Sequence, residues 1–278
     1  MRIHILNCGT IRPRGARIFV PDMSVTPCLC LLIEDGDRLL LVDTGFGMMD
    51  MEDPYRTGYS NVLLNHPHDK EQTALRQIKV MGFNSSQVTD IICTHLDRDH
   101  AGGLPDFPKA KVHVMRIERD SALYPPTLKE RERYRKYHFS HNPKWVTHEA
   151  TSSQDWFGME CIKEMDGLPP EIVLIPLPGH TRGHCGVAVK DGKGWLLHCG
   201  DAYYTSKELA EGEKAPLGVR CFRSIAHMNH AAAMFQLDRI RTLLRERGDQ
   251  IATIATHDWT EYSRRFSENI NSLIFYSQ

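Results

Sequence analysis

The sequence predicts an α/β fold in which two β-sheets pack face to face and helices cover their outer sides. Short apolar segments typical of strands are separated by Gly- and Asp-containing turns, and these segments fall into two groups along the chain. A helical pattern follows strands in each group, which favours this layered arrangement. With 278 residues, of which 41% are hydrophobic and 25% charged, the chain is long enough to bury a sizeable core.

The first group of strands contains a hairpin. Two apolar runs, 28–33 and 39–42, flank the turn residues 34–37, a pattern typical of two buried antiparallel strands. Residues 70–81 have the spacing of an amphipathic helix, which Gly82 would end. The remaining strands of this group are predicted at 2–7, 88–94 and 111–115.

The second group of strands has its own helix. Residues 229–247 carry a stripe formed by Met234, Leu237, Ile240 and Leu244, and Gly248 would end the helix. No repeat of fixed short period is present in the sequence, so the two groups are not copies of a repeated unit. Strands of this group are predicted at 172–177, 185–189, 195–199 and 251–256.

We expect a single domain over residues 1–278, with a lid-like insert at about 116–164. This segment is rich in Arg, Lys, Glu, His and Tyr, and its apolar periodicity is weak. Pro125-Pro126 and Asn142-Pro143 interrupt it, and it is too long for a simple connection. Segments of this kind form lids over substrate pockets, and the alternative is a solvated pair of surface helices.

Charge and hydrophobicity limit the classes of partner. The formal net charge of -1 gives no global field that would favour nucleic acid or an anionic membrane. No apolar run approaches the roughly 18–20 residues that span a bilayer, and residues 1–10 resemble a strand more than a signal peptide. We therefore expect a cytoplasmic protein acting on a small molecule, whose eight cysteines are free thiols. The sequence leaves open whether the chain forms a homodimer.

Four potential metal ligands lie within six residues directly after the predicted strand 88–94. In extended backbone, His95 and Asp97 point the same way and can converge on one ion. Asp99 and His100 lie past the turn and can face a neighbouring site. Gly102-Gly103 then permits a tight bend. The alternative is a set of polar turn residues that face water.

Other predicted strands also end in His or Asp. Hard or borderline ligands at successive strand ends are what a shared metal site requires, so the sequence predicts one such site. The residues that follow strands in this way are Asp43, His180, Asp201 and His257.

Together these residues resemble the pattern of the metallo-β-lactamase superfamily, from about Cys28 to His257. That pattern is an Asp, then His-x-His-x-Asp-His, then His, Asp and His, each at a strand end. Asp43 matches the first Asp, His95, Asp99 and His100 match the second motif, and His180, Asp201 and His257 match the rest. The resemblance implies a four-layer αββα sandwich with two divalent metal ions at one edge, and hence a metal-dependent hydrolase.

Asp97 departs from this pattern, because most members have His at that position. The change replaces a neutral nitrogen with an anionic oxygen, which shifts preference from zinc toward iron or manganese. Flavodiiron proteins also carry a carboxylate there, so a diiron redox or oxygen-linked role is an alternative. Those proteins add a flavodoxin-like domain, for which this chain has no room.

Within the superfamily the sequence most resembles the N-acyl homoserine lactonase branch. The similar segments are 26–28 with 42–45, 178–184, and 201–204. This resemblance places Tyr204 where those lactonases have a tyrosine that contacts the substrate carbonyl.

The resemblance also implies roles in opening a lactone or ester by a metal-bridging hydroxide. Asp201 would bridge the metals, and Asp99 would also carry a proton to the leaving group. Asp43 and His184 would not bind the metals themselves but would hold the metal ligands in position. Arg182 would bind an anionic group of the substrate or lie in solvent. Thioester or phosphoester hydrolysis, and a non-catalytic metal-binding module, remain alternatives.

Overall fold

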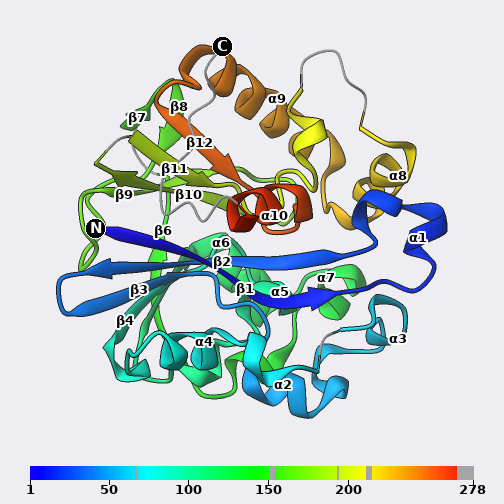
Figure 1. The fold of residues 1–278 in the computed structure, drawn as a ribbon, viewed down its shortest axis with the longest axis horizontal. Helices are drawn as coiled ribbons and strands as arrows, with labels where there is room; N and C mark the ends of the chain where they lie inside the picture. Colours follow the sequence, from blue (N-terminus) through cyan, green and yellow to red (C-terminus); the bar gives the residue numbers. More distant parts are fainter. Residues whose placement is uncertain (67, 151–153, 193, 211–214, 268–278) are drawn as a thin grey trace.

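The structure is a computed structural model that describes residues 1–66, 68–150, 154–192, 194–210 and 215–267, and its strands form two large sheets and one small one (Figure 1). The first sheet has six strands in the order β1-β2-β3-β4-β5-β6, the second has four in the order β12-β11-β10-β9, and β7 pairs with β8. The strands are β1 (Arg2–Ile11), β2 (Thr26–Asp35), β3 (Arg38–Val42), β4 (Val88–Ile92), β5 (Lys111–Met115), β6 (Lys144–His148), β7 (Gln154–Trp156), β8 (Met159–Cys161), β9 (Ile172–Pro176), β10 (Cys185–Asp191), β11 (Gly194–His198) and β12 (Ile251–Ile254).

Both sheets mix antiparallel and parallel neighbours. The predicted hairpin is confirmed, since β2 and β3 are antiparallel with Leu31 opposite Val42. From β3 to β6 all neighbours in the first sheet are parallel. In the second sheet β9, β10 and β11 are antiparallel, and β12 adds in parallel to β11. Parallel neighbours place the ends of several strands at one edge of each sheet.

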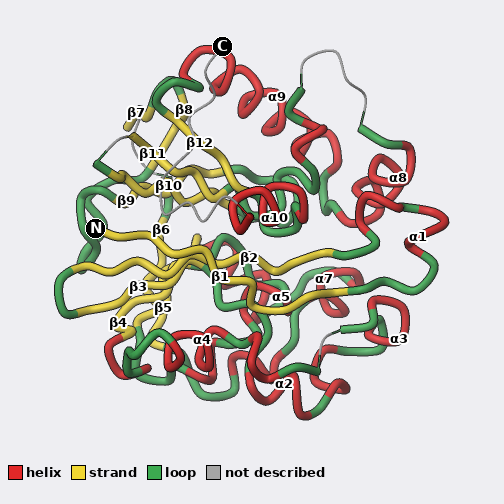
Figure 2. Tube along the Cα trace, in the orientation of Figure 1, coloured by secondary structure: helices red, strands yellow, loops and turns green. Residues whose placement is uncertain are grey.

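The alternation of side chains along β2 explains the layers. Leu31 packs into a buried core with Val187 of β10, between the two sheets. Leu32 points the opposite way and packs with Ile78 of α4. On the far side of the second sheet, Leu237 of α9 packs in a third cluster of buried side chains. The order is therefore helix, sheet, sheet, helix, and the predicted αββα sandwich is confirmed (Figure 2).

The helices lie on the outer sides of the sheets (Figure 1). Among the described residues, none is both long and apolar enough to cross a membrane. The eight cysteines are free, as expected, and all but Cys221 are buried. The helices are α1 (Ala16–Phe19), α2 (Met48–Glu52), α3 (Asn61–Leu64), α4 (Ala74–Val80), α5 (Arg98–Ala101), α6 (Arg116–Leu123), α7 (Leu128–Arg133), α8 (Leu217–Ala226), α9 (His230–Arg247) and α10 (Trp259–Ser267).

The helix predicted at 70–81 was placed too early in the chain. Asp69 accepts a hydrogen bond from the amide of Glu71, and a short 3-10 turn spans Lys70–Gln72. The α-helix begins only at Ala74, where the side chain of Thr73 caps it by accepting from the amide of Arg76. Two consecutive caps divide the amphipathic pattern, because each stops the preceding turn from continuing.

Segment 116–164 adds a strand to the first sheet and contacts the edge of the second. Strand β6 completes the first sheet beside β5, with Trp145 opposite Val112. An isolated bridge joins Ile162 to Leu174 of β9. Helices α6 and α7 precede β6, and the weak periodicity of the sequence did not predict these elements.

Candidate metal centre

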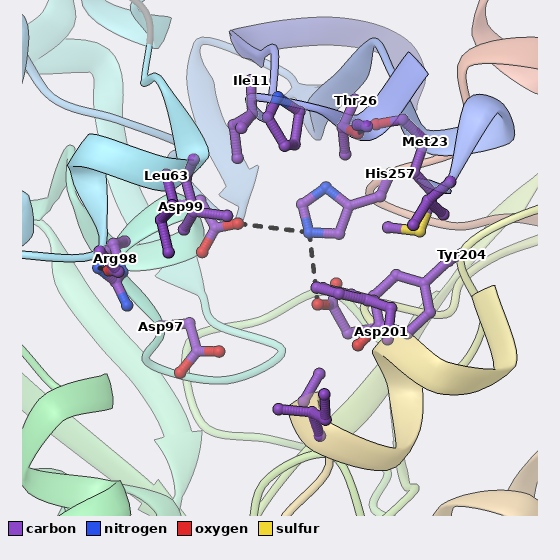
Figure 3. A pocket seen from close by; sticks show the side chains of 18 of the residues that line it. Ile11, Met23, Thr26, Leu63, Asp97, Arg98, Asp99, Asp201, Tyr204 and His257 are labelled. Atoms are coloured by element: carbon purple, nitrogen blue, oxygen red, sulfur yellow. Dashed lines mark hydrogen bonds and ion pairs between the residues drawn. The ribbon is translucent and has the colours of Figure 1, made fainter. Parts of the chain in front are cut away.

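The ends of strands from both sheets bring the predicted polar side chains to one place. Asp43 follows β3, His95 follows β4, His180 follows β9, and Asp201 and His257 follow β11 and β12. All five side chains are buried. Figure 3 shows Asp97, Asp99, Asp201 and His257 around a common space, beside Tyr204. The centre therefore lies at one edge of the sandwich, between the two sheets.

The polar atoms divide into two neighbouring groups, which we name the first and second subsites. In the first subsite, Oδ2 of Asp97 lies 3.3 Å from Nε2 of His95 and 3.2 Å from Nε2 of His180. In the second subsite, Nε2 of His257 lies 3.3 Å from both Oδ2 of Asp99 and Oδ2 of Asp201. His100 belongs to the second subsite, with Nε2 3.2 Å from Oδ1 of Asp201. Asp201 also contacts His180, at 3.4 Å, and so adjoins both subsites.

Hydrogen bonds behind the second subsite turn the imidazole Nε2 atoms inward. Nδ1 of His257 lies 2.8 Å from the carbonyl oxygen of Pro27, an acceptor, so Nδ1 carries the proton. Nδ1 of His100 lies 2.8 Å from Oδ2 of Asp43, with the same consequence. A carboxylate or carbonyl that accepts from Nδ1 of a ligand histidine in this way leaves Nε2 to bind a metal.

Unpartnered polar atoms test whether a metal fits these residues. Nε2 of His100 and Oδ1 of Asp201 are buried and have no hydrogen-bond partner within the described residues. Buried polar atoms nearly always have a partner, and a cation between them would supply one. The second subsite, with two imidazoles and two carboxylates, therefore fits a divalent ion. Nε2 of His95 is also unpartnered in the first subsite.

The carboxylates of the centre are ionised despite their burial. Burial opposes ionisation of Asp201, but the adjacent His257, His100 and His180 hold the pKa of its carboxyl well below the usual range. Burial likewise opposes ionisation of Asp97, and the Arg133 guanidinium and His95 lower its pKa more strongly. The centre thus presents the anionic oxygens that a divalent cation requires.

The position of Asp201 depends on His184 and Gly200. Burial lowers the pKa of His184 to about 3, so its ring is neutral. Nδ1 of His184 donates to the carbonyl of Leu177, and Nε2 accepts from the amide of Asp201 over 3.0 Å. Gly200 has a φ of +54°, and a Cβ there would lie 2.5 Å from Nε2 of His184. Glycine therefore allows the backbone to approach close enough for this hydrogen bond.

Glu118 of α6 joins the two loops that carry the ligands. Its Oε1 accepts a hydrogen bond from the amide of Leu96 over 3.0 Å, and Oε2 accepts from the amide of Gly183, also over 3.0 Å. Oε1 also accepts from the hydroxyl of Tyr134 over 3.1 Å. Because Glu118 is fully buried, this one carboxylate fixes the loop of residues 95–100 against that of residues 180–184.

Arg133, the last residue of α7, reaches the first subsite. Its Nη1 lies 2.6 Å from Oδ2 of Asp97 and 2.9 Å from Nε2 of His180. Sequence reasoning missed both Arg133 and Glu118, because the segment that carries them has no clear periodicity. The anionic residue at position 97 is the one sequence signal that could have prompted a search for a nearby cation.

A cavity of about 500 Å³ opens onto the centre (Figure 3). Tyr204, Asp97, Asp99, Asp201 and His257 lie at its polar end. The structure places Arg182 elsewhere: its guanidinium pairs with Glu130 and is not part of the cavity wall. Much of the remaining wall is apolar and includes Val20, Met23, Leu63, Leu64, Phe222 and Ile225.

Comparisons with known proteins agree with this geometry. The family model of the metallo-beta-lactamase superfamily matches residues 23–268. A probable metallo-hydrolase of Mycobacterium tuberculosis is 38% identical over 258 residues, which cover 93% of this chain and 80% of that protein. An N-acyl homoserine lactonase of Bacillus cereus is 25% identical over 188 residues, covering 66% of this chain and 67% of the relative.

The fold is also similar to a solved structure of an N-acyl homoserine lactone hydrolase with the product N-hexanoyl-L-homoserine bound at its catalytic metal center. The TM-score is 0.71, the sequence identity is 19%, and the match covers 95% of each chain. At this identity the likeness bears on the fold alone.

Proposed function

Because the chain belongs to the metallo-beta-lactamase superfamily, we propose that it is a metal-dependent hydrolase that opens a lactone or ester. The observation that carries the proposal is the second subsite. Asp201 contacts His100 and His257 there, His257 also contacts Asp99, and the unpartnered atoms of His100 and Asp201 are buried. Zinc is the ion we expect, with manganese and iron as alternatives.

A bound divalent metal would supply a water of lowered pKa as nucleophile and would polarise the substrate carbonyl. The chain's own residues then orient the reaction. Asp43 and Pro27 accept hydrogen bonds from the Nδ1 atoms of His100 and His257, which directs the Nε2 atoms of both rings inward. Asp99, which lines the cavity, would pass a proton toward a leaving oxygen.

Tyr204 would donate a hydrogen bond to the carbonyl or leaving oxygen of the substrate. It lines the cavity, and its hydroxyl lies 3.1 Å from Nδ1 of His180. Nε2 of His180 accepts from Arg133, so Nδ1 carries the proton of the neutral ring; it lies 3.1 Å from the tyrosine oxygen and 3.1 Å from Nδ1 of His227. The hydroxyl hydrogen of Tyr204 is then available to the substrate.

The apolar wall of the cavity supports a substrate with an apolar acyl or alkyl part next to its carbonyl. Met23, Leu63 and Phe222 are among the residues of that wall. Ligand sites of this kind combine apolar walls with a few convergent polar groups. The resemblance to the lactonase of Bacillus cereus supports the same class.

Metal analysis combined with turnover tests the proposal. The wild-type protein and Asp201→Asn are assayed on lactones, esters, a thioester and a phosphotriester, before and after chelation and after reconstitution with zinc, manganese or iron. We expect chelation to abolish lactone or ester turnover and metal to restore it. Loss of a group that only supports a metal ligand lowers metal affinity by roughly 10–100-fold. Asp201→Asn changes a ligand itself, so its metal affinity should fall by at least this much.

Asp166→Asn, which changes an exposed aspartate, is the matched control and should behave like the wild type. Full metal content and full activity in Asp201→Asn would contradict the proposed function. Turnover of the thioester or phosphotriester in preference to the others would transfer the proposal to that class of substrate.

A further inference from the structure

Three hydrogen bonds hold Arg133 at the first subsite. Nη2 of its guanidinium group donates to the carbonyl oxygen of Ala226 at the end of α8. Nη1 carries two hydrogens and has two acceptors, Oδ2 of Asp97 at 2.6 Å and Nε2 of His180 at 2.9 Å. The side chain is 10% exposed. The arginine is thus a buried cation with defined partners, which distinguishes it from a solvated surface charge.

The partners of Arg133 include an atom that a metal in the first subsite would need. A neutral imidazole nitrogen has one lone pair, so Nε2 of His180 can accept a hydrogen bond from Arg133 or bind a metal, but it cannot do both. Asp97 is the anion of this subsite, and its charge is already balanced by the guanidinium group. A divalent ion at the same place would also be repelled by a positive charge in a buried environment.

The second subsite has different neighbours. The ion pairs of Asp99 and Asp201 are made with histidines, namely His257, His100 and His180. The Nε2 atoms of His100 and His257 face carboxylates, and their Nδ1 atoms donate to Asp43 and to the carbonyl of Pro27. A metal entering the second subsite therefore displaces no arginine.

We propose that Arg133 takes the place of one metal ion, so that the chain binds a single divalent ion, in the second subsite. This proposal rests on the proposed function, because it assumes that the second subsite binds metal. It also gives Asp97 a role: the carboxylate at this position pairs with a fixed cation, which a neutral histidine there would not do. The two subsites are then one metal site and one internal ion pair.

Cobalt(II) titration of the full-length apoprotein, followed by its visible absorption bands and by elemental analysis after dialysis, tests the proposal without an activity assay. The wild type should saturate at one cobalt ion per chain. Arg133→Ala should saturate at two, because His95, Asp97 and His180 are then free to bind a second ion. Arg131→Ala removes an exposed arginine of the same helix and should remain at one.

The outcomes separate this inference from the proposed function. Two ions in the wild type would overturn the inference and leave the metal-dependent hydrolase standing. One ion in a folded Arg133→Ala protein, verified by circular dichroism, would also overturn it. No ion in any variant would overturn both proposals. If Arg133→Ala does not fold, the wild-type stoichiometry alone decides, because one ion supports the inference and two contradict it.

Discussion

Oδ2 of Asp43 accepts a hydrogen bond from Nδ1 of His100 over 2.8 Å, and both side chains are fully buried. Asp43 sits directly after β3 with a φ of +57°, and its two oxygens also accept from the amide and hydroxyl of Thr94. This left-handed backbone conformation aims the carboxylate at the strand end of its neighbour β4. Asp43 therefore determines which nitrogen of His100 is free to face the second subsite.

Asp43→Asn should weaken zinc binding by about 10–100-fold, because loss of the carboxylate behind a ligand histidine removes the constraint on its tautomer. Competition with a chromophoric chelator measures this affinity. Asp90→Asn is the control, since Asp90 forms a similar buried pair with His113, at 3.0 Å, outside the metal centre. Equal zinc affinity in Asp43→Asn and the wild type would show that the pair does not orient the ligand.

Tyr204→Phe should lower kcat by about 10²–10³-fold, the usual effect of losing a donor to a developing oxyanion. KM and metal content should change little, because the aromatic ring and the ligands remain. Steady-state kinetics on the best substrate of the panel measures the effect. Tyr203→Phe is the matched control, because the hydroxyl of Tyr203 donates to Glu261 and not into the cavity. An unchanged kcat in Tyr204→Phe would exclude the tyrosine as a donor.

Asp106→Asn should stabilise the protein at alkaline pH and not at acidic pH. Burial raises the pKa of Asp106 to about 7, helped by the charge of Asp50 and opposed by the amide of Met48. Between about pH 4 and pH 7 the folded state therefore binds more protons than the unfolded state, and stability falls as the pH rises. Asparagine keeps an acceptor for Met48 and carries no charge.

Urea unfolding at about pH 4, 6 and 8 measures this difference in the free energy of unfolding. The advantage of Asp106→Asn should be absent at the lowest pH and reach up to a few kcal/mol at the highest, since one pKa unit corresponds to about 1.4 kcal/mol. An advantage of the same size at every pH would rule out ionisation of Asp106 as its cause.

Glu118→Gln should destabilise the fold by about 1–3 kcal/mol. The backbone N–H groups of Leu96 and Gly183 each donate to a carboxylate oxygen of Glu118, and in the variant the NH₂ group of the glutamine would replace one of these acceptors with a donor. Thermal and urea unfolding of the metal-free protein measure the change. Glu246→Gln alters an exposed glutamate of α9 and serves as the control. A Glu118→Gln protein as stable as the wild type would mean that the two loops are held together by other contacts.

The two sheets and the strand-end side chains could be predicted because they depend on short-range patterns. The apolar pattern of β2, and a His or Asp that follows a strand, can each be recognised from a few consecutive residues. Strand β6 and helices α6 and α7 could not, since their side chains pack against partners far along the chain. Arg133 illustrates this limit, because its partners Asp97 and His180 lie 36 and 47 positions away.

The placement of the ligands on both sheets gives a bound ion a mechanical role. Asp99 and His100 follow a strand of the first sheet, whereas Asp201 and His257 follow strands of the second. An ion in the second subsite would therefore act as a cross-link between two halves of the polypeptide. As with a disulfide, such a link reduces the entropy gained when the halves separate, and long enclosed segments benefit most. Loss of the ion would then loosen the contact between the sheets before either sheet itself came apart.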